Sequence, residues 1–146
     1  MVDGLTADTR GLNDLAKDVR LVAVRLESEV SAELVASANS VADLARKIAV
    51  GHSQKVADSI HVRPAGKKTA RVEAGAGVPI AGIWELGNRG SDPRSPTFVH
   101  PVYGVAGTSV VQAKHPYLSR AFDESEPAVI ERFVRMAGHL LDESRL

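Results

Sequence analysis

The stretch that decides the fold is "LNDLAKDVRLVAVRLESEVSAELVASANSVADLARKIA", residues 12–49, which contains neither proline nor glycine. Its first apolar side chains recur at intervals of three and four, at Leu12, Leu15, Val19, Val22, Leu26, Val30 and Leu34. This spacing places them on one stripe of an α-helix. It predicts a long amphipathic helix over about residues 5–50, which the serine and asparagine side chains of "SANS", residues 37–40, could interrupt.

The predicted helix is long for a domain of this size. Without a break it would span about 55 Å at 1.5 Å per residue. A compact domain of 146 residues is narrower than that. We therefore expect part of the helix to pack against something outside its own domain.

The segments that follow alternate β-branched with polar residues. "SIHVRPA" and "TARVEAG", joined by "GKK", predict a hairpin near residues 59–63 and 69–74. "TFVHPVYG" and "TSVVQAK" predict two more strands around "VAG", and the turn-forming residues 88–96 predict an exposed loop. "PIAGIWELGN" fits either a short helical turn or a strand.

The last segment, "SEPAVIERFVRMAGHLLDESRL", predicts a carboxy-terminal amphipathic helix over about residues 124–143, with Pro127 in its first turn. The fold class predicted for the whole chain is α+β. It has a long amino-terminal helix, a β-rich middle over about residues 57–115 with a small antiparallel sheet of about four strands, and this second helix. We expect residues 1–146 to form a single domain.

The composition is that of an ordinary globular protein. Lysine plus arginine and aspartate plus glutamate number 18 each, and there is no cysteine. The absence of cysteine excludes disulfides, thiolate zinc sites and cysteine nucleophiles. No apolar run approaches the roughly 18 residues of a membrane span, and "MVDGLTADTRGL" lacks the apolar region of a signal peptide. We expect folding in the cytoplasm and no contact with a membrane.

No motif in the sequence predicts a reaction. The spacings of the five histidines, His52, His61, His100, His115 and His139, match no metal-ligand template. No GxSxG elbow is present, and the acids Asp123, Glu124 and Glu126 are explained by a helix amino terminus. We therefore predict no catalytic, cofactor or metal site and no enzyme activity; an enzyme using His100 and His115 is the weaker alternative.

A basic cluster lies on the first predicted hairpin. It consists of Arg63, Lys67, Lys68 and Arg71. Four charges at a β-turn are usually a solvated surface, but they could also contact phosphate. A small nucleic-acid-binding module that uses this hairpin is therefore an alternative function.

Aromatic residues, which are few in this chain, flank the polar loop. Packing in the core explains one or two of Trp84, Phe98, Tyr103 and Tyr117. The others are candidates for anchors at a subunit boundary, where Trp and Tyr contribute much of the binding energy.

The order of several short motifs resembles the tail-component family of long-tailed double-stranded DNA phages, also called neck or tail-completion proteins. "HPVYG" at residues 100–104 is similar to the "HPVFG"-like strand of the family. "HPYLSRA" at residues 115–121 is similar to its "PYFxPA" signature, with Arg120 at the second proline. "AGIWELGN" aligns Trp84, Glu85 and Gly87 with a further motif, and "KVADSIHV" aligns Ser59 and Ile60. The resemblance covers most of residues 5–143.

The resemblance implies a subunit that forms a ring at the capsid-tail junction of the virion, assembled in the cytoplasm of a bacterial host. Its partners would be copies of itself, adjacent head-closure or adaptor proteins, and tail-tube or tail-terminator proteins. Genomic DNA would pass through the ring without specific binding. The loop would order against a neighbouring subunit, and the isolated chain would be monomeric or mixed in oligomeric state. The expected interface residues are Trp84, Glu85, Arg89, Asp92, Arg94, Phe98, Tyr103 and Tyr117.

Overall fold

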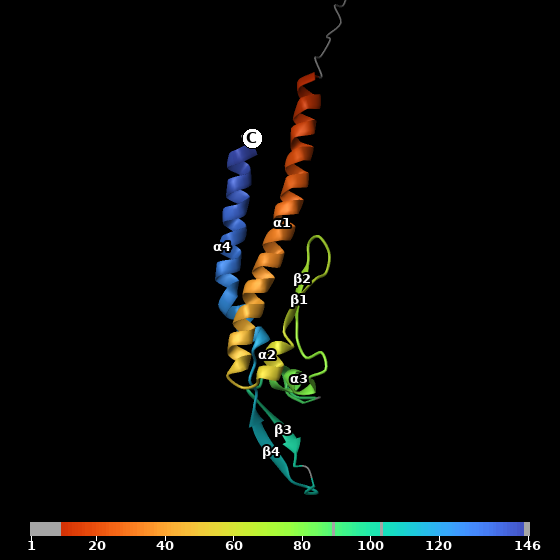
Figure 1. Ribbon diagram of the computed structural model, residues 1–146, viewed down its shortest axis with the longest axis vertical. Helices are drawn as coiled ribbons and strands as arrows, with labels where there is room; N and C mark the ends of the chain where they lie inside the picture. Colours follow the sequence, from red (N-terminus) through yellow and green to blue (C-terminus); the bar gives the residue numbers. More distant parts are fainter. Residues whose placement is uncertain (1–9, 89, 103, 145–146) are drawn as a thin grey trace, which may run out of the picture.

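Two long antiparallel helices form the frame of the molecule (Figure 1). The computed structural model describes residues 10–88, 90–102 and 104–144. The first helix, α1, spans Arg10–Val50 and ends before Gly51, which confirms the long amino-terminal helix from residue 10 onward. It is not interrupted at residues 37–40. The hydroxyl of Ser37 donates a hydrogen bond to the Glu33 carboxylate at 3.2 Å, and that of Ser40 donates one to the Ala36 carbonyl at 3.2 Å. Both serines therefore stay within the helix.

The carboxy-terminal helix, α4, spans Leu118–Ser144 and runs back along α1. It begins six residues before the predicted start near residue 124, and Pro127 lies in its interior instead of its first turn. Proline at this site cannot donate a hydrogen bond to the carbonyl of Asp123, yet the helix continues through it, so the predicted place of Pro127 was wrong. The earlier start depends on a contact with α3, described below.

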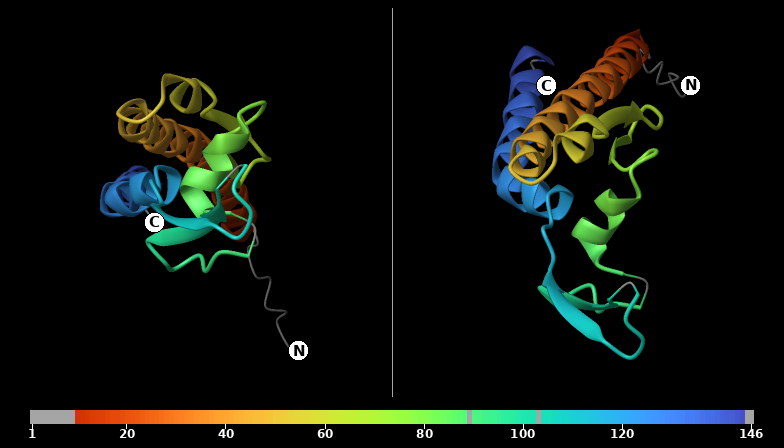
Figure 2. Two further views of the ribbon diagram at one scale, coloured as in Figure 1. Left: turned by 90° about the horizontal axis from the view of Figure 1, so that it is seen from below. Right: turned by 60° about the horizontal axis from the view of Figure 1, so that its bottom comes forward.

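The described residues contain four strands, as predicted, but these form two separate antiparallel hairpins instead of one sheet. In one, β1 (His61–Pro64) pairs with β2 (Ala70–Glu73), and in the other β3 (Thr97–Pro101) pairs with β4 (Ser109–Ala113). Between them "PIAGIWEL" forms a helix, α3 (Pro79–Leu86), with Pro79 in its first turn. β1–β2 lies along α1, whereas β3–β4 projects from the end of the molecule away from the carboxy terminus (Figures 1 and 2).

The hydrophobic core is small and lies at one end of the helix pair. A short helix, α2 (Gln54–Asp58), turns the chain back after α1 and is capped by Ser53. The guanidinium of Arg46 donates to the carbonyl of Ile60 at 2.7 and 3.1 Å, which fixes the entry into β1. The core residues are Val41, Ala42, Ala45, Ala49, Val56, Ala57, Ile60, Ala81, Tyr117 and Ala121. Six of the ten are alanine, whose small side chains allow the backbones of α1, α2 and α4 to approach closely.

Much apolar surface stays outside this core. The chain exposes 10804 Å², against about 7,200 Å² for a compact protein of its mass. The amino-terminal part of α1 rises beyond the end of α4 (Figure 1), and Leu15, Val19, Leu21 and Val24 are exposed on it. None of the described helices is long and apolar enough to cross a membrane.

Candidate subunit interface

Glu85 joins α3 to the amino terminus of α4. Its carboxylate accepts hydrogen bonds from the backbone N–H groups of Tyr117, Leu118 and Ser119, at 2.8, 2.9 and 2.8 Å. These are among the donors that a helix cannot satisfy within itself, and a negative charge is favourable at this end of a helix. Glu85, from a distant part of the sequence, therefore sets the start of α4.

Tyr117 is buried beside this cap, with 2% of its surface exposed. Its hydroxyl donates to the carbonyl of Ala81 at 3.2 Å, which ties α3 to α4 a second time. Burial, and to a smaller extent the charge of Glu85, raise the pKa of Tyr117 to about 12. Tyr117 thus belongs to the core, and its ring is not available to a partner of the folded chain.

Trp84 lies beside a pair of adjacent histidines. Its ring meets those of His52 and His115 edge-on, with centroid distances of 5.8 and 6.0 Å, and the two imidazoles lie 4.2 Å apart. His100 instead lies 5.7 Å from Phe98. Among the described residues, no three His, Cys, Asp or Glu side chains come together in a group that could hold a metal ion. Trp84 is half-buried against the core, so part of its ring reaches the surface.

The loop of residues 88–96 is held by side chains within the chain. The ammonium of Lys114, a buried residue, donates to the Asp92 carbonyl at 2.6 Å, and the Asn88 amide donates to the Val99 carbonyl at 2.6 Å. Gly87 precedes the loop with a φ of +82°, and a Cβ there would lie 2.8 Å from Cε of Lys114. Only glycine fits both conditions. The described part of the loop therefore has a defined shape in the single chain.

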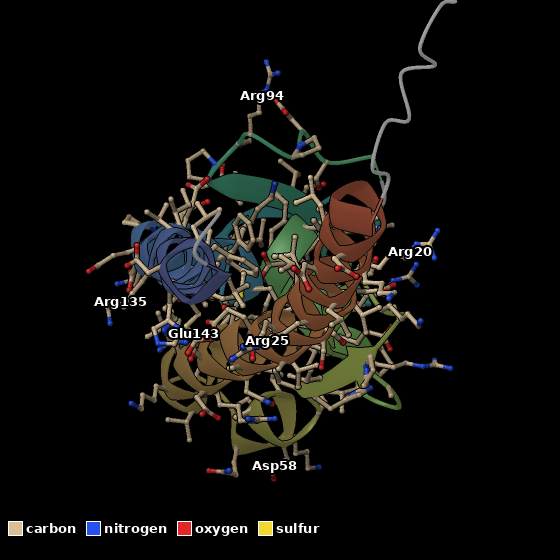
Figure 3. The ribbon with its side chains drawn as sticks, turned by 90° about the horizontal axis from the view of Figure 1, so that it is seen from above. Arg20, Arg25, Asp58, Arg94, Arg135 and Glu143 are labelled. Atoms are coloured by element: carbon tan, nitrogen blue, oxygen red, sulfur yellow. The ribbon has the colours of Figure 1, made fainter. Side chains whose placement is uncertain are left out.

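The expected interface residues fall into three groups. Asp92 and Arg94 are exposed on the loop, and Arg94 points away from the body of the molecule (Figure 3). Trp84 and Glu85 are half-buried on α3. Phe98 and Tyr117 are buried within the chain. The remaining two, Arg89 and Tyr103, lie outside the described residues.

Exposed apolar side chains that were not among the expected interface residues lie on several elements, including the β3–β4 hairpin and α4. On the projecting hairpin, Val99 and Val111 are direct cross-strand partners and both are exposed, Val111 to 65%. On α4, Phe122, Ile130 and Val134 are exposed, Val134 to 67%. The wide apolar face of α4 was visible in the sequence, but only the packing against α1 shows which part of that face stays uncovered.

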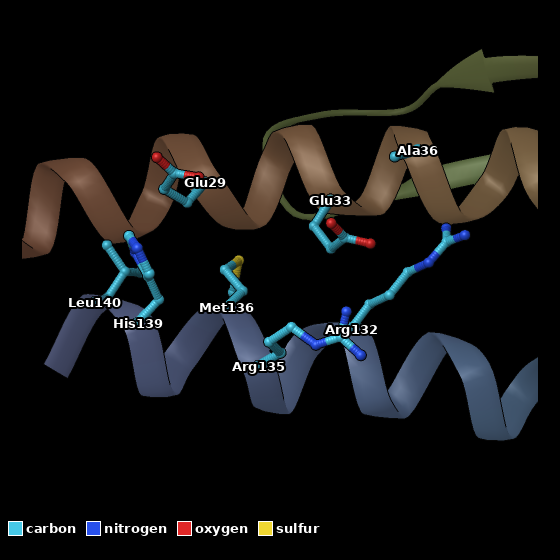
Figure 4. Close-up of a pocket in the computed structure, with 8 residues that line it drawn as sticks. All are labelled: Glu29, Glu33, Ala36, Arg132, Arg135, Met136, His139 and Leu140. Carbon is cyan, nitrogen blue, oxygen red and sulfur yellow. The ribbon is translucent and has the colours of Figure 1, made fainter. Parts of the chain in front are cut away.

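An apolar groove of about 430 Å³ lies where α1, β2 and α4 meet. No charged residue lines it, and its larger apolar side chains are Leu34, Val41, Val72, Leu118, Phe122, Val129 and Phe133. A second hollow between α1 and α4 differs in character (Figure 4). There Glu29 and Glu33 of α1 face Arg132, Arg135 and His139 of α4. The first groove is thus the one suited to an apolar occupant.

No protein-family model, curated protein or solved structure matches this chain.

Proposed function

We propose that this chain is a structural subunit of the head-to-tail junction of a tailed phage, of the neck, tail-completion or tail-terminator type. It acts by forming a ring with copies of itself and by joining the adjacent junction proteins of the virion. The motif order, from the "AGIWELGN" segment to "HPYLSRA", supports the family. The observation that carries the assembly role is the apolar surface left uncovered by the single chain, including the groove where α1, β2 and α4 meet, since contiguous apolar surface marks interaction sites.

The uncovered surfaces are of two complementary shapes. The β3–β4 hairpin projects and carries Val99 and Val111, while the groove around Phe122 is hollow. An isolated two-stranded hairpin is marginally stable in water, so β3–β4 gains stability from a partner. A projection on one copy that fits a hollow on the next forms a head-to-tail contact. Repeated contacts of this kind close into a ring when the rotation from one subunit to the next divides a full turn evenly. We propose that β3–β4 of one subunit docks in the groove of its neighbour.

The head-to-tail arrangement can be tested by mixing two variants. Val111→Glu removes the projecting surface and keeps the groove, whereas Phe122→Glu does the reverse. Each variant alone should stay monomeric in sedimentation velocity, and an equal mixture should form dimers through the one intact contact and nothing larger. Gln112→Glu is the control, because it adds the same charge as Val111→Glu on the opposite face of the same strand. It should assemble like the original chain.

If the original chain is monomeric when isolated, the same variants are compared by complementing a phage that lacks the gene. Val111→Glu and Phe122→Glu should then give heads and tails that are not joined, while Gln112→Glu gives infectious particles. Antibody labelling of purified particles should place the chain at the capsid-tail junction. Particles that do not contain the chain would contradict the proposed function, and full yield with both variants would contradict the docking contact alone.

A further inference from the structure

The outer face of the β1–β2 hairpin places two arginines directly opposite each other. In the register of the ladder Arg63 pairs with Arg71, and Val62 pairs with Val72. The valine pair packs against the core, so the arginine pair points outward, and both arginines are exposed. Cross-strand partners have Cβ atoms about 5 Å apart, and like charges at that spacing destabilise a hairpin. Neither guanidinium has an ion pair or hydrogen bond within the described chain.

More cations extend this surface along the hairpin. At its tip Lys67 makes a long contact of 3.7 Å with Glu27 of α1, and Lys68 has no ion-pair partner in the described chain. The exposed Lys67–Glu27 pair holds the tip only weakly. On α1, Arg20 points to the side of the molecule on which the hairpin lies (Figure 3). Residues 61–73 carry four lysines and arginines against one acid, Glu73, which contacts His61 at 3.5 Å.

The surface lacks the apolar component of a protein interface. The exposed large apolar side chains of the described chain lie on α1, α3, the β3–β4 hairpin and α4, and none lies between residues 51 and 79. Protein interfaces have an apolar core, whereas surfaces that contact nucleic acid are polar and strongly positive. Paired guanidiniums match the geometry of phosphate oxygens. The features of this hairpin therefore favour phosphate over an acidic protein.

We propose that the outer face of β1–β2, with Arg63, Lys67, Lys68 and Arg71, binds the phosphate backbone of duplex DNA. A phosphate placed near Arg63 and Arg71 would relieve the repulsion between them and accept hydrogen bonds from both. Phosphate contacts carry no sequence information, so the binding is independent of sequence. This activity goes beyond assembly and uses a different surface, so it does not depend on whether the chain forms a ring.

The test is fluorescence anisotropy of the full chain with a labelled duplex of arbitrary sequence. Four phosphate contacts predict a slope of about −3.6 in a plot of log Kobs against log salt, or a loss of roughly 100-fold in affinity between about 50 and 200 mM salt. The double variant Arg63→Gln with Arg71→Gln should lower the slope by about 1.8 in magnitude. Circular dichroism would verify that it is folded.

The matched control is Arg120→Gln with Arg135→Gln. It has the same change in net charge on the exposed face of α4, where Arg135 points away from the hairpin (Figure 3). It should bind DNA like the original chain. The proposal is overturned if both double variants lose DNA affinity equally, or if no binding is detected at about 50 mM salt and about 100 μM protein. It is also overturned if polyglutamate competes as well as unlabelled duplex at equal charge, because that result would indicate an acidic protein partner.

Discussion

At the scale of single residues, Glu85 connects the middle of the chain to its last helix. Replacing it with alanine leaves three backbone N–H groups of residues 117–119 without their acceptor. We expect Glu85→Ala to lower the free energy of unfolding by about 1–3 kcal/mol, measured by urea denaturation followed through Trp84 fluorescence. Glu124→Ala, which removes only an exposed ion pair with Arg120, should change it by less than about 0.5 kcal/mol. Equal effects of the two substitutions would contradict the capping role.

Tyr117 makes stability depend on pH in the alkaline range. Its pKa is raised from 10.0 to about 12 in the folded chain, so the unfolded chain loses the phenolic proton first as pH rises. The contribution is fully present below pH 10 and is lost between pH 10 and about 12, with a size of about 1–3 kcal/mol. Urea unfolding at several pH values should show this loss in the original chain and a smaller one in Tyr117→Phe. If the free energy of unfolding fell equally with pH in both chains, the role of Tyr117 would be refuted.

At the scale of elements, α4 contains a proline that its packing tolerates. Pro127 cannot donate to the carbonyl of Asp123, and a proline inside a helix costs up to about 3 kcal/mol. The residue is exposed, so alanine would fill its place without a clash. We expect Pro127→Ala to raise the free energy of unfolding by about 1–3 kcal/mol, measured by thermal and urea denaturation. A decrease would mean that the position needs the proline ring.

The β1–β2 hairpin should also become more stable when its like charges are removed. Threonine at position 71 keeps a residue suited to strands and removes the repulsion with Arg63. We expect Arg71→Thr to stabilise the chain by about 0.2–1 kcal/mol without DNA and to weaken DNA binding. A stabilising substitution that costs a binding activity is typical of functional surfaces. If Arg71→Thr destabilises the free chain, Arg71 makes a favourable contact that contradicts this account.

At the scale of the whole molecule, stability should be concentrated at one end of α1. Residues 38–49 of this helix turn one face into the core, while residues 14–24 are almost entirely exposed. A helix end with little tertiary packing opens easily, because propensity alone barely supports a helix of that length. Hydrogen exchange at low protein concentration should therefore be at least ~10-fold faster at residues 14–24 than at residues 38–49.

The same measurement bears on assembly. If copies of the chain or its junction partners cover the exposed end of α1, exchange at residues 14–24 should slow in the assembled state, while residues 38–49 change little. Exchange that is equally slow in both segments of the dilute chain would show that the exposed end is stable without a partner. That result would remove one reason to expect a neighbour along this part of α1.

Elements with a local signal in the sequence could be predicted without the structure. The 3.6-residue period and the absence of proline and glycine were enough to predict α1 and its end near residue 50. Alternation and turn residues were enough for both hairpins, whose bounds differ from the prediction by a few residues. The basic cluster and the aromatic residues around the loop were also visible, but the sequence did not show which of them are exposed.

The way these elements combine depends on contacts between distant parts of the chain and could not be predicted. Glu85 starts α4 at Leu118, thirty-three residues further along the chain, and a contact over that distance leaves no periodic signal. The two hairpins do not pair with each other, which leaves β3–β4 without a larger sheet to join. Burial depends on which surfaces meet, so the burial of Phe98 and Tyr117, and the exposure of Val111 and Phe122, required the packed chain.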